Sequence, residues 1–421
     1  MNETSVSRIR LLPRARSLVP GDLAEKLLHR VLAKISTGSL TIRDGDRVLR
    51  FGERGRPDEP HAEVVVHDRD VYRKVLTGGT IASGEAYIEG EWSSPDLTEV
   101  TRLFSANTAA LESMQASQHW YVRLGLRIAH AMNRNTHEGS RRNISAHYDL
   151  GNDFFRLFLD PTMMYSSAIF DDPRASLERA AVAKLDEICQ RLELVPSDHL
   201  LEIGTGWGGM ALHAAAQYGC RVTTTTISRE QFEHASAEVK RRGLEDRVTV
   251  LCQDYRQLTG RYDKLVSVEM IEAVGHDFYA SYFQCCSRLL ADNGRMVIQA
   301  ITIPDQRYER ARRSVDYIKR YIFPGGCLPS LSVIADHVAR DTDMQLVHLR
   351  DITRDYAHTL ARWRSRFLER LDAVRELGFD DRFIRMWEFY LCYCEGGFRE
   401  RIIGTAQLAF AKPGYRPPEP A

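Results

Sequence analysis

Apolar residues between positions 176 and 303 follow two alternating spacings, one typical of helices and one typical of strands. The segment "SLERAAVAKLDEICQRL" (176–192) opens on Ser176, a favourable N-cap residue, and places its apolar residues on one helical stripe. Short apolar runs then alternate with helical segments: "HLLEI", "RVTTTTI", "RVTVLCQ", "KLVSVEM" and "RMVIQAITI". Strands alternating with helices of 10–15 residues predict a parallel, doubly wound sheet, with "GTAQLAFAK" (404–412) as its final strand.

A different pattern precedes this region. A helical start, "LAEKLLHRVLAKI", leads into the strand-like segments "SLTIRD", "RVLRFG" and "AEVVVHD" and the glycine-punctuated piece "LTGGTIASGEAYIEGEW". The breaker cluster "NRNTHEGSRRN" (133–143) then separates the two regions. We predict a smaller N-terminal α+β domain (1–130), a linker with lid helices (131–175), and a larger α/β domain (176–421) with a mainly helical, substrate-binding insertion at about 304–400.

Composition narrows the class of protein. Of 421 residues, 43% are hydrophobic and 27% charged, as in soluble globular proteins, and 57 basic residues balance 57 acidic ones. The overall charge therefore predicts no nucleic-acid partner. No apolar run is long enough to span a membrane, and the N-terminus lacks a signal-peptide pattern. Arg8, Arg10, Arg14 and Arg16 form a basic cluster, which is either a solvated terminus or a contact for anionic lipid headgroups.

The eight cysteines indicate neither a disulfide framework nor CxxC pairs. A reducing cytoplasm fits this pattern best. His147 lies beside Asp149 in "HYDLGND", but no second His/Cys cluster supports a metal site, so we expect no metal and a structural role for His147 at a helix entry.

The loop after the first strand of the α/β region, "LLEIGTGWGGM", carries Gly204, Gly206 and Gly209 in G-x-G-x-x-G spacing. Dinucleotide-binding and S-adenosylmethionine-binding folds share this pattern. A nicotinamide site expects an acid about 20 residues further on, where this chain has "TTTTISREQ". Glu202 before the glycines can accept an ammonium group, and "QDYR" (253–256) adds a polar cluster after the third strand, so the loop favours S-adenosylmethionine.

The fourth strand runs into two acids in "KLVSVEMIEAVGH" (264–276), with no cation beside them. Glu272 falls at the edge where doubly wound sheets bind ligands. Glu269 either lines the cofactor pocket or faces solvent, because side chains one step apart on a strand point to opposite faces.

Eight segments in order resemble the cyclopropane-fatty-acyl-phospholipid synthases: "RNISAHYDLGNDFF", "MMYSSAIF", "LEIGTGWGGMA", "TTISREQ", "QDYR", "VEMIEAVGH", "RYIFPGGCLPS" and "YCEGGFR". The resemblance covers about residues 60–415 and is greatest to the plant and proteobacterial branch. It implies a class I S-adenosylmethionine methyltransferase fold, a Rossmann-like doubly wound sheet with an antiparallel last strand.

The resemblance also implies site residues and cofactors. The S-adenosyl-L-methionine site would comprise Tyr165, Ser166, Glu202, Gly204, Thr205, Gly206, Trp207, Gly208, Gly209, Thr226, Ile227, Ser228, Gln231, Asp254 and Tyr255. In the family a bicarbonate ion acts as the base, and its ligands would be Ser167, Glu272, Gln299, Ile301 (through its backbone) and Tyr356. Cys394 matches a cysteine associated with activity. Free cysteines are commonly buried, so Cys394 is either that residue or part of the core.

Alkene methylation explains why a base is needed. Attack of the π bond on the methyl group leaves a carbocation, which becomes a cyclopropane when a base removes a proton from the added carbon. Two positions depart from the family pattern, since many members have cysteine at 167 and histidine at 299. Gln299 donates a hydrogen bond but cannot shuttle a proton. At position 269, relatives often have small residues.

The predicted reaction is methylene transfer to the cis double bond of an unsaturated phospholipid, by a homodimer peripherally attached to the inner face of the membrane. Loss of a different proton would instead give a methyl- or methylene-branched chain. Two further alternatives are a lipid-binding protein without chemistry and an O- or N-methyltransferase for a small molecule.

Overall fold

The computed structural model describes residues 20–53, 55–108 and 150–417, and its contacts divide the chain into two units. Unit 1 combines Met1–Ala129 with Val315–Ile322 and Leu360–Ile402, and unit 2 contains the rest. The predicted boundaries at 130 and 176 stay a prediction, but two pieces of the insertion at 304–400 group with unit 1. The N-terminal arginine cluster, His147 and the part of the predicted linker before residue 150 lie outside the described residues.

Unit 1 contains, among its described residues, a four-stranded sheet of order β2-β1-β3-β4. Its strands are β1 (Gly38–Asp44), β2 (Arg47–Glu53), β3 (His61–Val66) and β4 (Trp92–Ser93), and its helices include α1 (Gly21–Leu32), α2 (Asp70–Ile88), α3 (Leu97–Ala106), α14 (Tyr317–Tyr321), α17 (Leu371–Glu376) and α18 (Asp381–Arg399). The glycine-punctuated piece lies in α2, which bends at Gly79, where φ is 61° and ψ is −144°.

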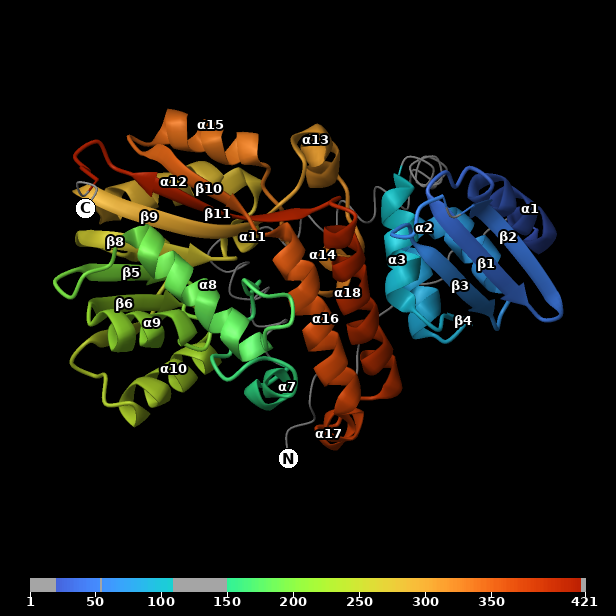
Figure 1. The fold of residues 1–421 in the computed structure, drawn as a ribbon, viewed down its shortest axis with the longest axis horizontal. Coiled ribbons are helices and arrows are strands. Elements are labelled where there is room, and N and C mark those ends of the chain that lie inside the picture. Colours follow the sequence, from blue (N-terminus) through green and yellow to red (C-terminus); the bar gives the residue numbers. More distant parts are fainter. Residues whose placement is uncertain (1–19, 54, 109–149, 418–421) are drawn as a thin grey trace. The chain divides into compact units, whose positions relative to one another are not determined.

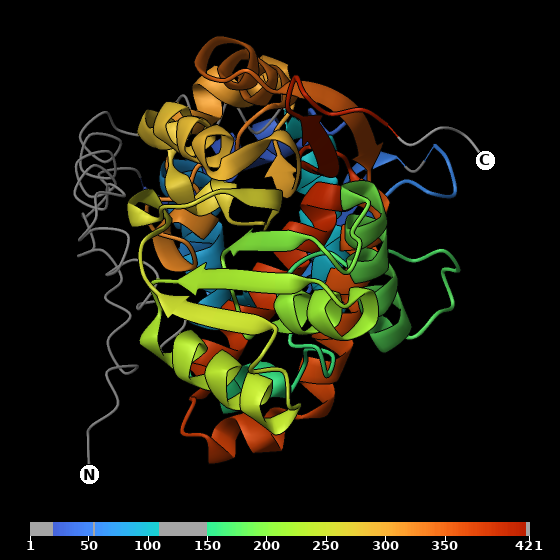
Figure 2. The ribbon, with the colours of Figure 1, turned by 90° about the vertical axis from the view of Figure 1, so that its left-hand side faces the viewer.

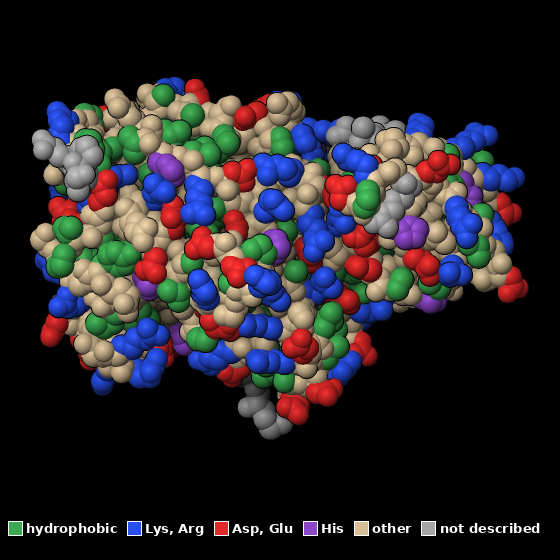
Figure 3. All heavy atoms as spheres, in the orientation of Figure 1, with side chains coloured by type: hydrophobic (Ala, Val, Ile, Leu, Met, Phe, Trp, Pro, Cys, Tyr) green, Lys and Arg blue, Asp and Glu red, His purple; other side chains and the backbone are tan. Residues whose placement is uncertain are grey.

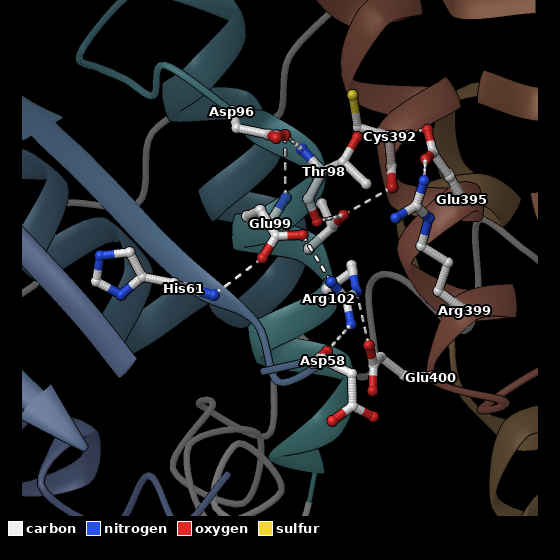
Figure 4. A network of polar contacts seen from close by, with 11 residues as sticks. Asp58, His61, Asp96, Thr98, Glu99, Arg102, Cys392, Glu395, Arg399 and Glu400 are labelled. Carbon is white, nitrogen blue, oxygen red and sulfur yellow. Dashed lines mark hydrogen bonds and ion pairs between the residues drawn. The ribbon is translucent and has the colours of Figure 1, made fainter. Parts of the chain in front are cut away.

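Polar contacts connect α3 to α18 inside unit 1 (Figure 4). The Thr101 hydroxyl donates to the Cys392 carbonyl at 2.7 Å, and Arg102 on α3 forms an ion pair of 2.8 Å with Glu400. A Cβ added at Gly396 would lie 2.4 Å from the Thr101 hydroxyl oxygen, so α18 approaches α3 closely only because residue 396 is glycine. The C-terminal helix is therefore part of the N-terminal unit.

Unit 2 is built on a seven-stranded sheet among its described residues, with strand order β10-β11-β9-β8-β5-β6-β7. Its strands are β5 (His199–Ile203), β6 (Arg221–Thr226), β7 (Val248–Cys252), β8 (Tyr262–Val268), β9 (Leu290–Thr302), β10 (Gln345–Asp351) and β11 (Gly404–Ala411). The five adjacent strands β9, β8, β5, β6 and β7 pair in parallel, whereas β11 pairs antiparallel with both β9 and β10. The predicted doubly wound sheet with an antiparallel last strand is confirmed.

Helices cover both faces of this sheet (Figures 1 and 2). One core packs against α8 (Leu177–Leu192), α9 (Gly209–His213) and α10 (Arg229–Arg241), and the other against α12 (Tyr279–Leu289) and α15 (Leu331–Asp341). Neighbouring strand residues alternate between the two cores: Leu200 and Val266 belong to the first, Leu201 and Leu265 to the second. Helix α8 starts as predicted, because the Ser176 hydroxyl caps it by accepting from the Arg179 N–H.

The region 304–400 contains the helices α13 (Asp305–Arg313) to α18, and it also contributes β10, a strand that the sequence pattern did not predict, to the sheet edge. The apolar residues Leu346, Val347 and Leu349 of β10 are exposed. Its sequence therefore lacks the alternation of buried apolar and exposed polar residues that predicts a strand. The α12 segment also turns into β9 at residue 290, earlier than its sequence pattern indicated. Within the described ranges, no helix is long and apolar enough to cross a membrane. On the face in Figure 3, basic and acidic side chains are interspersed.

Candidate active site

The glycine loop joins β5 to α9 and adopts backbone conformations that favour glycine. Gly204, Gly206 and Gly208 have φ values of 100°, 52° and 91°. A Cβ at Gly206 would meet no atom within 4 Å, so the loop leaves open space there. A Cβ at Gly209 would lie 2.5 Å from the Thr162 carbonyl oxygen, so this glycine permits close packing of the segment before α8. The loop can therefore cradle a ligand against its backbone.

Glu202, at the end of β5, is buried beside the loop. Its Oε2 accepts from the Thr224 hydroxyl at 2.6 Å, and Thr224 also contacts the Thr205 hydroxyl at 2.7 Å. Burial raises the pKa of Glu202 to about 8, while Thr224 and Lys184 act in the opposite direction. A buried carboxyl group with hydroxyl neighbours suits the ammonium group of an aminoacyl ligand.

The ends of β6 and β7 supply further predicted cofactor residues. Thr226 donates its hydroxyl to Gln231 Oε1 at 2.9 Å, and Ser228 caps α10. Ile227 lies between them at the end of β6. After β7, Asp254 forms an ion pair of 2.6 Å with Arg256. These segments lie at the carboxyl edge of the parallel strands, as does the glycine loop.

Aromatic side chains from the segment before α8 pack near the loop. Trp207 donates Nε1–H to Asn152 Oδ1 at 2.6 Å, and its ring centroid lies 4.9 Å from that of Phe155. The ring of Tyr165 lies 5.3 Å from the same phenylalanine. Asn152 and Phe155 belong to the short helix α7 (Asn152–Arg156), so the loop tryptophan is fixed by a second segment.

Glu269 follows β8 directly and receives three hydrogen bonds from uncharged groups. Its Oε1 accepts from the Ser167 backbone N–H at 2.9 Å and from Gln299 Nε2 at 2.8 Å, and its Oε2 accepts from the Tyr356 hydroxyl at 2.8 Å. Its φ of 48° is in the left-handed region, which is unusual for a non-glycine residue and is typical of functional sites. Burial raises the pKa of Glu269, and the three donors lower it.

The amide of Gln299 is held in one orientation. Its Oε1 accepts from Gln407 Nε2 at 2.9 Å, so its Nε2 donates to Glu269 and to the Ser167 carbonyl oxygen, the latter at 3.1 Å. Gln299 and Ser167 are fully buried. The two neighbouring strands β9 and β11 thus aim an N–H donor at the Glu269 carboxylate.

Glu272 lies one turn further on, in α11 (Ile271–Val274), rather than at the strand end itself. Its Oε1 accepts from the Ile301 backbone N–H, and its buried Oε2 has no hydrogen-bond partner among the residues that the structure describes. Burial, followed by the charge of Glu269, raises the pKa of Glu272 to about 8. The two carboxyl groups therefore differ, since Glu269 accepts three hydrogen bonds and Glu272 accepts one.

Cys394 belongs to unit 1, on α18, whereas the other predicted site residues belong to unit 2. Burial raises the pKa of its thiol well above the ordinary value. It is therefore not a thiolate at neutral pH.

Sequence reasoning missed Lys184 and Gln407 and left Glu269 undecided. Lys184 is fully buried on α8, donates to the Ser166 hydroxyl at 2.8 Å, and has its pKa lowered by burial to about 8. Its charge acts on Glu269, Asp160 and Glu202. The sequence feature that could have revealed Lys184 is its position on the apolar stripe of α8, beside Ala181 and Leu185.

The comparisons with known proteins agree with this geometry. The fold is that of a class I S-adenosylmethionine methyltransferase, and the cyclopropane synthase MmaA2 from Mycobacterium tuberculosis superposes with a TM-score of 0.60 at 30% identity, covering 65% of this chain and 98% of that structure. The family model described as mycolic acid cyclopropane synthetase matches residues 135–408. The chain therefore belongs to the mycolic acid cyclopropane synthetase family.

Two relatives extend the match into the N-terminal unit. The tuberculostearic acid methyltransferase UfaA1 of Mycobacterium tuberculosis is 37% identical over 400 residues, which are 93% of this chain and 91% of the relative. The cyclopropane-fatty-acyl-phospholipid synthase of Escherichia coli (strain K12) is 37% identical over 354 residues, or 83% of this chain and 88% of the relative. The predicted family resemblance is confirmed, and the chain is a methyltransferase of this family.

Proposed function

We propose that the protein transfers a one-carbon unit from S-adenosylmethionine to the cis double bond of an unsaturated phospholipid and forms a cyclopropane ring. The observation that carries this proposal is the carboxylate site at the edge of β8 and β9, beside the glycine loop. A Cβ at Gly204 would lie 3.2 Å from the Met270 side chain, next in the chain to Glu269, so the loop and the site are adjacent.

The residues present fit S-adenosylmethionine. The open backbone at Gly206 and the buried Glu202 would hold its aminoacyl part, and the predicted set that includes Thr226, Gln231 and Asp254 would hold the rest. The structure of the mycolic acid cyclopropane synthase CmaA1 complexed with SAH, at 30% identity and a TM-score of 0.61, supports this assignment. When bound, the cofactor supplies a methyl carbon whose bond to sulfur breaks as the alkene π pair bonds to it, leaving a carbocation on the acyl chain.

Residues of the chain then govern the fate of that cation. The Glu269 carboxylate stabilises positive charge in a site whose other groups are mostly uncharged donors, where electrostatic effects are stronger than in water. Proton loss from the added carbon completes the ring. The family resemblance predicts bicarbonate as the base, and this stays a prediction to which we assign no step.

A second candidate product is a methyl- or methylene-branched acyl chain, and the relative UfaA1 favours it. Migration of a hydride before proton loss gives the methylene branch, and a methyl branch requires a reductant in addition. Association with the inner membrane face, a cytoplasmic location and a homodimer are part of the same proposal, since the lipid substrate must be taken from a bilayer.

The test is incubation of the purified protein with S-adenosylmethionine and vesicles of a cis-unsaturated phospholipid, followed by mass spectrometry and NMR of the released acyl chains. Cyclopropane ring protons on a product one CH₂ heavier support the main proposal. The same mass with an exocyclic methylene supports the second candidate. No mass gain, with cofactor binding demonstrated, contradicts both.

A further inference from the structure

We propose that the Glu269 side chain is the base of the reaction and replaces the bicarbonate ion that the family resemblance predicts. This inference rests on the proposed function and assigns its proton-transfer step to a residue of the chain.

The donors expected to bind bicarbonate are already engaged by carboxylates of the protein. The groups predicted as its ligands include Ser167, Gln299 and Tyr356, and all three donate to Glu269 in the structure, at 2.8–2.9 Å. The Ile301 backbone N–H donates to Glu272. Bicarbonate and Glu269 would compete for the same hydrogen bonds, so the residues present do not fit the ion.

Burial raises the pKa of Glu269, but the polar groups around its side chain act in the opposite direction and favour the ionised form. Each group that hydrogen-bonds this side chain within the described part of the structure is a donor and is uncharged. Gln407 fixes the Gln299 amide so that its N–H, rather than its oxygen, faces Glu269. Donors aimed at a carboxylate stabilise its charged form, and Lys184 adds a positive charge nearby.

Glu272 differs in the way expected of the protonated member of a carboxyl pair. It accepts one backbone hydrogen bond, and its buried Oε2 has no acceptor or donor partner among the described residues. Neighbouring carboxyl groups whose surroundings differ in this way separate into an acid and a base. The negative charge of the pair therefore resides on Glu269.

The proton has a defined destination. Oε1 of Glu269 accepts two hydrogen bonds and Oε2 accepts one, which leaves an acceptor position on Oε2. In the proposed step a C–H bond of the transferred carbon breaks and its proton moves to Oε2. The C–H electron pair forms the second C–C bond, which closes the ring and discharges the cation. The Glu269 carboxylic acid then returns the proton to solvent, so no other reactant is required.

The first test uses the unaltered protein. Turnover with saturating S-adenosylmethionine and dioleoyl phospholipid vesicles is measured in buffer stripped of carbon dioxide and again with added bicarbonate. We expect the same rate in both. A rate that falls about tenfold without bicarbonate and returns on its addition would overturn the inference but not the proposed function, because a base supplies such factors whatever its identity.

The second test uses Glu269→Gln, which retains the shape and removes the base. We expect product formation to fall by about 10²–10⁴-fold, the range for a lost general base. Affinity for S-adenosylhomocysteine, measured by calorimetry, should stay unchanged and would show that the variant is folded. Glu245→Gln, an exposed residue before β7, is the matched control and should keep the full rate. A Glu269→Gln variant within about tenfold of the wild type would overturn the inference.

A third variant distinguishes a role of Glu269 as the base from a purely structural role. Glu269→Gly empties the position facing the three donors, so added formate or bicarbonate should restore part of the lost rate. Neither should restore Glu269→Gln, whose amide fills the space. Failure to restore Glu269→Gly would give Glu269 a structural role and contradict the inference. If the wild type methylates no unsaturated lipid under any condition, the proposed function itself fails, and the inference fails with it.

Discussion

Each of the two units contains a buried glutamate with a different set of partners. In unit 1, Glu395 on α18 is fully buried and forms ion pairs with Arg364 at 3.3 Å and Arg399 at 2.7 Å (Figure 4 shows the latter). In unit 2, Glu269 is held by a backbone amide, a glutamine and a tyrosine. Arginines neutralise the first carboxylate, whereas uncharged donors leave the charge of the second available to a cation or a proton.

The partners therefore indicate the role better than burial does. The ion pair of Arg364 with Glu395 connects α16 (Thr353–Glu369) to α18, which is a structural task. The left-handed backbone at Glu269 is unfavourable for a glutamate, and such positions persist where function requires them. The predictions below test this division between a structural and a reactive carboxylate.

The largest expected effect on stability is that of Glu395→Gln. Removing one charge from a buried ion-pair network leaves its arginines uncompensated, and we expect a loss of about 3 kcal/mol, reduced from the fully buried case because both arginines are partly exposed. Thermal unfolding measures it, with the exposed Glu376→Gln as control. The folded fraction should retain its turnover. An unchanged melting temperature would remove the structural half of the comparison.

A smaller, pH-dependent effect is expected for Glu272→Gln. The pKa of Glu272 is raised to about 8 in the folded protein, from an ordinary value of 4.5. The folded state therefore holds this proton more tightly than the unfolded chain, and its contribution to stability is present below about pH 4.5 and is lost as the pH rises to about 8. Glu272→Gln carries no ionisable group at this position, so its stability does not fall for this reason as the pH rises. Its melting temperature relative to wild type, measured without cofactor, should rise from about pH 6.5 to pH 9, by the equivalent of roughly 2 kcal/mol. Parallel curves would show that Glu272 is not held protonated.

Lys184→Met tests the charge that acts on the reactive carboxylate. Lys184 lowers the pKa of Glu269, so its removal should raise that pKa and move the acidic limb of the turnover profile to higher pH. The profile of the exposed Lys240→Met should match the wild type. If the acidic limb does not move, the pH profile reflects the titration of a group other than Glu269.

Gln407→Leu should give the smallest effect. Without Gln407 Nε2, the Gln299 amide is no longer held with its N–H toward Glu269. We expect kcat to fall about tenfold, the lower end for lost supporting hydrogen bonds, with KM for S-adenosylmethionine unchanged. A change in KM with constant kcat would assign Gln407 to cofactor binding instead.

The sequence predicted the sheet and the glycine loop because both have strong local signals. Alternating strands and helices defined the order of unit 2, and the residues around Gly204 and Gly206 defined the turn after β5. Strand β10 was missed because it is exposed at the sheet edge. The grouping of α18 with the N-terminal residues was missed because it depends on contacts nearly 300 residues apart, such as that of Thr101 with Cys392.

The site was predicted less completely than the fold. Glu272 was indicated by its place after the fourth strand, and Gln299 by a family resemblance. The role of Glu269 depends on the partners of its side chain, which come from β9, α16 and the segment before α8. A strand pattern gives only the face toward which a side chain points, and the left-handed backbone at residue 269 breaks even that rule. Lys184 was hidden on a helix stripe that otherwise reads as core.

The most direct test of the central claim is a crystal structure of the protein with S-adenosylhomocysteine, grown with added bicarbonate. Our account predicts that the Glu269 carboxylate accepts from Ser167, Gln299 and Tyr356, with no separate ion among them. A planar bicarbonate bound by those three donors, with the Glu269 side chain turned away, would contradict it.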